Sequence, residues 1–228
     1  FPDPVTEPSI FQSFVLGALQ GLAEFLPVSS SAHLALAPWA LGWEEPGLAF
    51  DVALHVGTLV ALLGYFRQEW ISLVRAALSI AADRNVETPE QQRVIFLVIA
   101  TIPGAIAGLL LEKQAETIFR APALTAVALM IMGAVLWVVD SVAPRARRMH
   151  DMTWRDALLI GCAQAFALIP GVSRSGATIT AGRALRLDRE NAATFSFMMS
   201  MPIIAAAAMA LSSVSVVGNA LRLRRTQL

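Results

Sequence analysis

Long apolar runs separated by charged segments set the pattern of this chain. Val94–Leu111, Ala121–Val139 and Ala192–Val217 contain no charged residue. A helix needs about 20 apolar residues to span a bilayer, so each run predicts a transmembrane helix. Leu48–Phe66 predicts a fourth, although it carries two ionisable side chains. The pattern therefore predicts an all-α polytopic membrane protein.

The composition indicates a surface that faces lipid. Of the 228 residues, 56% are hydrophobic and 15% are charged, whereas a soluble domain has about 25% charged residues. The net charge of zero gives no sign of a nucleic-acid partner. The one cysteine, Cys162, cannot form an internal disulfide, and its apolar surroundings predict a small core residue.

Basic residues are concentrated in two of the segments that flank the predicted spans. The first holds Arg67, Arg75, Arg84 and Arg93, and the second holds Arg145, Arg147, Arg148 and Arg155. Cytoplasmic loops of membrane proteins are enriched in Lys and Arg, so both segments are expected on the cytoplasmic side. Phe25–Gly47 has no Lys or Arg and is expected toward the outside.

Two segments 144 residues apart resemble each other. Gly17–Ser31 (GALQGLAEFLPVSSS) aligns with Gly161–Ser175 (GCAQAFALIPGVSRS), with six identities in fifteen positions. Pro27 and Pro170 interrupt the two copies, because proline breaks a helix. Arginines follow only the second copy, so the charge bias is opposite. We predict inverted-topology repeats with two re-entrant, broken helix pairs whose tips meet inside the membrane.

The repeat also predicts the domain organisation. Residues 1–228 form a single integral membrane domain, with repeat one at about 10–111, a linking span at about 121–142 and repeat two at about 156–217. The first copy is followed by three spans and the second by one. We therefore expect two helices to be missing after Leu221, through a shortened chain or an end that departs from the repeat. The polar start FPDPVTEP shows no signal-peptide pattern.

The first tip carries several groups that could do chemistry. Gln20 and Glu24 are four residues apart and share one helix face. A carboxylate inside a membrane is costly and is a functional candidate by default. The three serines that follow, Ser29–Ser31, offer nucleophiles and hydrogen-bond donors to phosphate, and His33 offers an acid or a base.

The second tip, PGVSRSGAT, supplies a positive charge. The guanidinium fork of Arg174 matches phosphate oxygens in a bidentate way. Gly171 and Gly176 would let backbone N–H groups approach an anion. A nucleophile, a proton carrier and a charge clamp are what phosphoryl transfer needs.

Structural interpretations compete with these roles. Serines in apolar helices often bond one helix to another, and Arg174 could form a structural ion pair with Glu24. Asp51 and His55, also four apart, are expected to form a structural pair beside the site. The cluster as a whole favours chemistry, because a membrane interior rarely holds so many idle polar groups.

Metal binding has little support from motifs. The chain has no HExxH sequence, no Asp-rich pair and no GxxxxGK[ST] loop. Glu24 could still hold a divalent cation shared with phosphate oxygens, because Mg²⁺ is often bound by one or two carboxylates and a phosphate.

At these positions the chain resembles the undecaprenyl-diphosphate phosphatase family. The family motif (E/Q)xxxE followed by FLP(I/V)SSxxH reads QGLAEFLPVSSSAH here, and PGxSRSxxT reads PGVSRSGAT. The resemblance runs from about Ile10 to Ala210. It implies re-entrant helix pairs in inverted repeats and an enzyme of the bacterial inner membrane. That enzyme would remove one phosphate from undecaprenyl diphosphate on the periplasmic side, which recycles the lipid carrier for peptidoglycan synthesis and is linked to bacitracin tolerance.

The resemblance also implies residue roles. The implied catalytic residues are Glu24, Ser30, His33 and Arg174. The implied substrate-binding residues are Gln20, Ser29, Ser31, Gly171, Ser173, Ser175, Gly176 and Thr178. Ser30 falls on the proposed nucleophile and Arg174 on the diphosphate-binding arginine, with His33 as an alternative nucleophile. The implied cofactor is a divalent cation, Mg²⁺ or Ca²⁺, with Glu24 as its ligand. The implied partners are a polyprenyl diphosphate and membrane lipids, and a homodimer is left open.

Two other functions share features with this sequence. Another lipid phosphatase class uses K-x6-R-P, P-S-G-H and S-R-x5-H, but here the fragments occur in the wrong order and Thr180 stands where the last histidine belongs. That class is rejected. A polyprenyl-phosphate transporter or flippase would suit inverted repeats with broken helices equally well.

Overall fold

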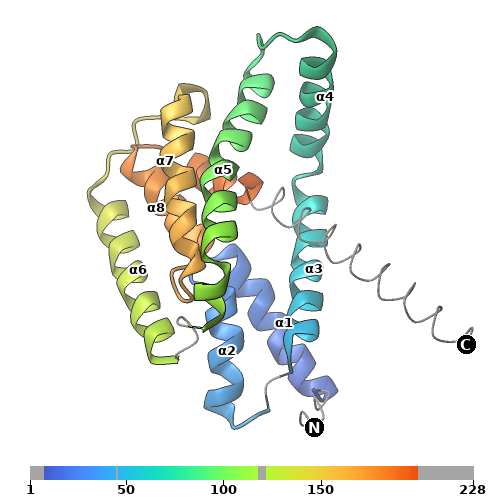
Figure 1. The fold of residues 1–228 in the computed structure, drawn as a ribbon, viewed down its shortest axis with the longest axis vertical. Coiled ribbons are helices and arrows are strands. Elements are labelled where there is room, and N and C mark those ends of the chain that lie inside the picture. Colours follow the sequence, from blue (N-terminus) through green and yellow to red (C-terminus); the bar gives the residue numbers. More distant parts are fainter. Residues whose placement is uncertain (1–7, 45, 118–121, 200–228) are drawn as a thin grey trace, which may run out of the picture.

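The computed structural model describes residues 8–44, 46–117 and 122–199, and most of these are helical, as the sequence predicts (Figure 1). The α-helices are α1 Ile10–Phe25, α2 Ser30–Leu41, α3 Leu48–Tyr65, α4 Arg67–Asp83, α5 Pro89–Thr117, α6 Pro122–Val142, α7 Trp154–Ala165 and α8 Arg174–Ala184. Short 3-10 turns lie at Met149–Asp151 and Phe166–Leu168, and residues 189–199 are helical. In the described part, β structure is limited to one isolated bridge between Arg147 and Leu187.

Two of the predicted spans are confirmed by length and composition. α5 contains the apolar stretch Pro89–Leu111, and α6 contains Ala123–Val142. Leu48–Phe66 matches α3, which passes the same test only together with α4, across a bend of 80°. Helix α4 was not predicted, and it occupies part of a segment that was expected on the cytoplasmic side. Most of the predicted span Ala192–Val217 lies outside the described residues.

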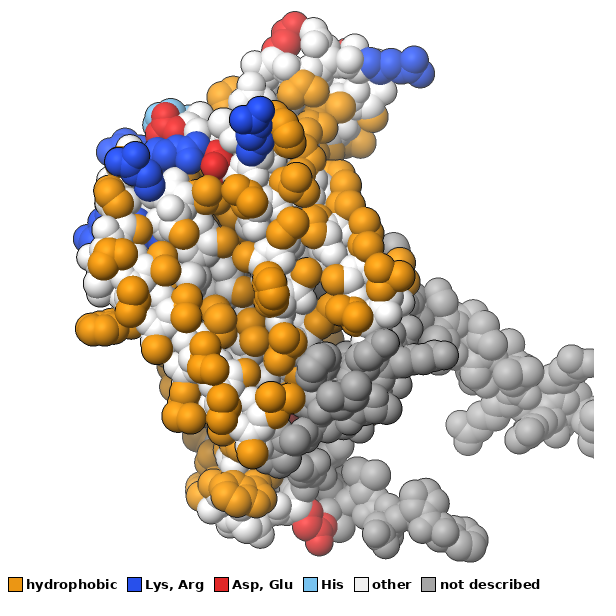
Figure 2. Space-filling view, turned by 60° about the vertical axis from the view of Figure 1, so that its left-hand side comes forward, with side chains coloured by type: hydrophobic (Ala, Val, Ile, Leu, Met, Phe, Trp, Pro, Cys, Tyr) orange, Lys and Arg blue, Asp and Glu red, His pale blue; other side chains and the backbone are white. Residues whose placement is uncertain are grey.

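The outer surface is apolar over much of its area. Hydrophobic side chains cover the face shown in Figure 2, and the Lys and Arg side chains visible there gather at its upper end. Trp137 on α6 is 73% exposed and Leu109 on α5 is 81% exposed. Cys162 is also exposed, so its prediction as a core residue was wrong. In a membrane protein, an apolar residue can face lipid as readily as the core.

Two helix hairpins, α1–α2 and α7–α8, have matching starts and breaks. Ser9 begins α1 with a capping box, and Thr153, 144 residues later, begins α7 with another. Ser29 precedes α2 at φ 62°, and Ser173 precedes α8 at φ 63°. Figure 1 shows α1–α2 in the lower half and α7–α8 in the upper half, with the breaks facing each other near the middle. The two predicted helix breaks are confirmed.

The core lies around α5, α7, α8 and residues 189–199. Its buried members are Leu73, Leu97, Ala100, Met149, Met152, Ala157, Ile160, Ile179, Leu187, Ala192, Phe195, Met198 and Met199. α5 and α7 cross so closely that a Cβ atom on Gly161 would collide with the Ala100 carbonyl group. Small residues allow such close helix contacts in membranes.

Buried ion pairs fix α7 and α8 to their neighbours. Arg183, which is fully buried on α8, donates to the Asp140 carboxylate on α6 at 2.7 Å. Arg147 donates to both carboxylate oxygens of Asp156, near the start of α7, at 3.1 and 2.6 Å. That hydrogen bond raises the pKa of Arg147. These contacts hold the second hairpin against α6 and the loop that follows it.

Candidate active site

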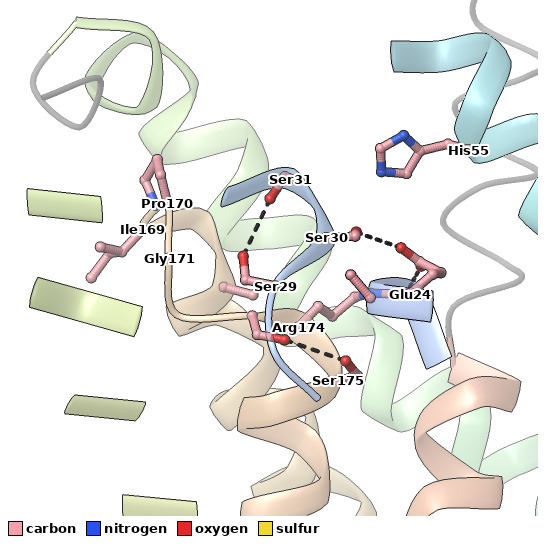
Figure 3. A pocket seen from close by; sticks show the side chains of 13 residues that line it. Glu24, Ser29, Ser30, Ser31, His55, Ile169, Pro170, Gly171, Arg174 and Ser175 are labelled. Atoms are coloured by element: carbon pink, nitrogen blue, oxygen red, sulfur yellow. Dashed lines mark hydrogen bonds and ion pairs between the residues drawn. The ribbon is translucent and has the colours of Figure 1, made fainter. Parts of the chain in front are cut away.

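A polar cavity of about 230 Å³ lies where the two hairpin tips meet (Figure 3). Its lining residues are Ala23, Glu24, Ser29, Ser30, Ser31, His55, Ala167, Ile169, Pro170, Gly171, Ser173, Arg174 and Ser175. Both sequence motifs contribute to this lining, and α3 adds a histidine. The structure therefore brings together residues from three separate parts of the chain.

Glu24 is the central acceptor of this cavity. Ser30 Oγ donates to Glu24 Oε2 at 2.6 Å, and Gln20 Nε2 donates to the same oxygen at 3.2 Å. Glu24 lies in the last turn of α1 and Ser30 is the first residue of α2, so the break between the helices turns the hydroxyl back toward the carboxylate. The carboxylate is placed to accept the proton of Ser30.

Arg174 reaches the same carboxylate from the other hairpin. Its Nη2 atom lies 3.4 Å from Glu24 Oε1, across a separation of 150 residues. Both side chains are mostly buried, but they line the cavity. The ion pair that competed with a functional role does form, and it forms inside the candidate site. A guanidinium group here could bind the oxygens of a phosphate.

Two helix N-termini face the cavity. Ser29 and Ser173 each precede a helix, and their hydroxyls contact those of Ser31 at 3.4 Å and Ser175 at 3.3 Å. The first N–H groups of a helix have no partner within it, and the helix dipole attracts anions there. Two such ends at one cavity favour a phosphate-containing ligand.

The two glycines of the second motif serve packing. Gly171 has φ +94°, and a Cβ atom there would collide with the Thr125 carbonyl oxygen of α6. A Cβ atom on Gly176 would lie 3.2 Å from the Pro27 carbonyl oxygen of the first tip. The Gly176 N–H already donates to Ser173 Oγ at 3.1 Å, so the structure does not offer that N–H to an anion as expected. Both glycines allow close backbone approach, and Gly171 also lines the cavity, where its contact with an anion stays a prediction.

Four predicted residues are not among the described lining residues of the cavity: Gly176, whose packing is given above, and Gln20, His33 and Thr178. Gln20 bonds to Glu24, as above. His33 Nδ1 lies 2.9 Å from the Ser29 carbonyl oxygen, on the same turn of α2. Thr178 Oγ1 bonds to the Arg174 carbonyl oxygen at 2.9 Å and to the Ser196 hydroxyl at 2.6 Å. From these positions, the side chains can hold the lining residues in place through hydrogen bonds.

His55 lines the cavity, and this position was not predicted from the sequence. It was expected to form a structural pair with Asp51, and its Nδ1 atom does lie 2.7 Å from the Asp51 carbonyl oxygen. Its ring also lines the cavity, however. The available signal was an ionisable side chain in an otherwise apolar predicted span, which is a functional candidate by default.

A divalent cation would find few protein ligands here. Glu24 is the one carboxylate in the described lining of the cavity. The described residues contain no group of three or more His, Cys, Asp or Glu side chains that could hold a metal ion. This donor set fits a cation that takes one carboxylate from the protein and its other ligands from phosphate and water, as Mg²⁺ often does.

The chain is similar to a known protein family and to several named proteins. The family model described as "Bacitracin resistance protein BacA" matches residues 13–226. The undecaprenyl-diphosphatase of Gemmatimonas aurantiaca is 59% identical over 199 residues, 87% of this chain and 74% of the relative. The undecaprenyl-diphosphatase of Pelotomaculum thermopropionicum is 54% identical over 199 residues, with the same coverage. That of Moorella thermoacetica is 50% identical over 201 residues, 88% of this chain and 75% of the relative. The chain therefore belongs to the family described as bacitracin resistance protein BacA.

Proposed function

We propose that this protein removes the terminal phosphate from undecaprenyl diphosphate and yields undecaprenyl phosphate. The observation that carries the proposal is the contact of Glu24 with both Ser30 and Arg174 in one polar cavity. A base beside a hydroxyl nucleophile and a guanidinium group are the parts that phosphoryl transfer needs. The names of the relatives support the same substrate.

In the first step, Ser30 Oγ attacks the terminal phosphorus and Glu24 accepts its proton. The bond between that phosphorus and the bridging oxygen breaks, and undecaprenyl phosphate leaves with the proton from Glu24. Ser30 is favoured over His33 as nucleophile because its hydroxyl lines the cavity and donates to Glu24 at 2.6 Å. Arg174 and the N-terminus of α2 would bind the phosphate oxygens and stabilise the negative charge of the transition state.

In the second step, water attacks the phosphoserine. Glu24, again a carboxylate, accepts a proton from that water and returns it to Ser30 Oγ as inorganic phosphate leaves. Gln20 would hold the carboxylate in place through its 3.2 Å hydrogen bond. The products are inorganic phosphate and a free Ser30 hydroxyl, so the cycle closes.

The proposal includes a divalent cation, Mg²⁺ or Ca²⁺. Glu24 would be its protein ligand, with the substrate phosphates and water completing the coordination. When bound, the cation would neutralise phosphate charge. Glu24 already accepts bonds from three side chains, so its carboxylate would have to share its oxygens.

The proposed setting is the bacterial inner membrane, with the cavity reached from the periplasmic side. Support comes from the apolar helices and from the position of the arginine-rich loop after α6, at the end of the molecule opposite the α2–α3 turn in Figure 1. The paired hairpins would be inverted-topology repeats that enter from opposite leaflets. The enzyme would thereby return a lipid carrier to peptidoglycan synthesis, and removal of the diphosphate would account for bacitracin resistance.

Phosphate release from a polyprenyl diphosphate in detergent tests the proposal. The wild type should release phosphate, and Ser30→Ala should not. The matched control is Ser141→Ala, because Ser141 is an exposed serine on α6 whose hydroxyl bonds to the Trp137 carbonyl oxygen. Lipid movement across vesicles without phosphate release would instead support a flippase.

A phosphorylated enzyme intermediate would identify the nucleophile. Brief reaction with substrate labelled in the terminal phosphate should give an acid-stable label at Ser30. An acid-labile label at His33 would contradict the Ser30 mechanism while leaving the hydrolase assignment intact.

A further inference from the structure

We propose that His55 binds the transferred phosphate group of the substrate through its Nε2 atom. The inference rests on the proposed function and extends the substrate site to α3, outside both sequence motifs. It assigns a substrate-contacting residue that lies more than 20 positions from the nearest motif serine in the sequence.

The imidazole ring of His55 borders the cavity. His55 lines the same cavity as Glu24, Ser30 and Arg174. Figure 3 shows the imidazole across the cavity from Ser31 and above the contact between Ser30 and Glu24. A phosphate that approaches Ser30 would therefore enter the space that the imidazole borders.

A hydrogen bond to the backbone orients the His55 ring. Nδ1 lies 2.7 Å from the Asp51 backbone carbonyl oxygen, one helical turn earlier in α3. A carbonyl oxygen can only accept, so Nδ1 carries a proton and donates. This bond fixes the ring orientation and leaves Nε2 as the nitrogen that can meet a ligand.

The chemistry of Nε2 suits a phosphate. If His55 is an imidazolium ion, Nε2–H can donate to a phosphate oxygen. If the ring is neutral, Nε2 can accept from a phosphate hydroxyl. Each protonation state thus allows one hydrogen bond. Arg174 borders the cavity from the second hairpin and Glu24 from α1, so His55 would add a third element around the phosphate.

His33 shows why exposure to the cavity matters. Its Nδ1 atom also meets a backbone carbonyl four residues earlier, at 2.9 Å. The described lining of the cavity includes His55 but not His33. Two histidines with the same local hydrogen bond therefore differ in access to the ligand.

Steady-state kinetics of phosphate release from a polyprenyl diphosphate test the inference. His55→Leu should raise KM, and the inhibition constant of inorganic phosphate, by roughly 10- to 100-fold, as expected for loss of one hydrogen bond to a charged group. The kcat value should change much less. His55→Gln should recover most of the affinity, because its amide can reach and hydrogen-bond a phosphate. His150→Gln is the matched control, since His150 is an exposed loop residue near Asp151.

The possible outcomes separate the two proposals. If the wild type releases no phosphate, the proposed function fails, and titration with inorganic phosphate alone still decides whether His55 binds it. If the wild type is active and His55→Leu keeps wild-type KM and phosphate inhibition, the His55 inference is overturned. Loss of kcat alone, with unchanged phosphate inhibition, also overturns it. Should His55→Leu fail to fold, His55→Phe, which keeps a ring without the nitrogens, replaces it.

Discussion

The two hairpins share a backbone plan but carry different chemistry. A shift of 144 residues places Ser30 on Arg174, so the first residue of α2 is a hydroxyl nucleophile candidate and the first residue of α8 is a cation. The same shift places Glu24 on Leu168. One tip therefore supplies the carboxylate and the candidate nucleophile, and the other supplies the positive charge.

The equivalent glutamines of the two hairpins, Gln20 and Gln164, also differ in their contacts. Gln20 Nε2 bonds to Glu24, whereas both amide atoms of its counterpart Gln164 are buried without a hydrogen-bond partner in the described part of the chain. The second hairpin kept the amide but has an apolar residue where the carboxylate would stand. The two hairpins thus share the same backbone geometry, while the side chains at equivalent positions differ in charge and hydrogen bonding.

The largest expected effect comes from the residue at the start of α2. Ser30→Ala should lower kcat by about 10⁴-fold or more, because it removes the proposed nucleophile. Ser31→Ala, one position on, should cost far less, since its hydroxyl contacts Ser29 rather than Glu24. Single-turnover phosphate release measures both. Equal losses would break the proposed division between the two serines.

The charge at the start of α8 comes next. Arg174→Lys should reduce kcat/KM by roughly 10²- to 10³-fold, because an ammonium group keeps the charge but loses the planar fork. Arg186→Lys provides a comparison outside the cavity lining. The same phosphate-release assay applies. Retention of activity in Arg174→Lys would show that charge alone suffices at this tip.

The helix starts give a stability comparison. Asp156 of α7 bonds to Arg147 and Thr153 and is buried, whereas its counterpart in α1, Gln12, lies in an exposed capping box. Asp156→Asn should destabilise the protein by about 1–3 kcal/mol. Gln12→Ala should cost about 1 kcal/mol or less. Thermal unfolding in detergent would rank them, and equal shifts would contradict the comparison.

The pH dependence of the Asp156 contribution follows from its pKa. Burial opposes ionisation, but the hydrogen bonds from Arg147 and Thr153 outweigh it and lower the pKa of the carboxyl group. A group whose pKa is lowered by folding stabilises the folded state above its unfolded pKa, about 4 for Asp. That stabilisation is lost as the pH falls further. Asp156→Asn should therefore be closest to wild type in stability at the most acidic pH.

The two buried glutamines should differ in the property that they affect. Gln20→Leu should lower activity by about tenfold, because Glu24 loses one hydrogen bond. Gln164→Leu removes a buried amide that has no described partner, so it should leave stability unchanged or raise it slightly. Phosphate release and thermal unfolding should be measured on both variants. Equal changes in the two variants would show that the two amides are equivalent and would contradict the prediction.

Much of the fold could be predicted because the signals are local. Proline at 27 and 170 marks the helix breaks, and the long uncharged runs give α5 and α6. The 80° bend between α3 and α4 falls at Phe66, where no nearby proline predicts a helix break. Cys162 was misplaced because hydrophobicity does not distinguish a lipid-facing residue from a core residue.

The part of the site formed by the two motifs could be predicted, because a motif or the repeat brings those residues together. Glu24 and Ser30 meet across one chain reversal, and the repeat pairs that tip with Arg174. His55 has no counterpart in either motif, and its entry into the cavity depends on how α3 packs beside α1. The hydrophobic periodicity of a single helix does not predict tertiary packing of this kind.

The size of the cavity has a consequence for substrate choice. Pockets that enclose a whole drug-sized molecule measure about 300–1,000 Å³, and this one measures about 230 Å³. A polyprenyl chain cannot fit inside with its headgroup, so we expect the hydrocarbon to remain among the acyl tails of the bilayer. Isoprenoid length would then govern how well a substrate partitions into the membrane, and short and long prenyl diphosphates would be cleaved at similar rates once bound.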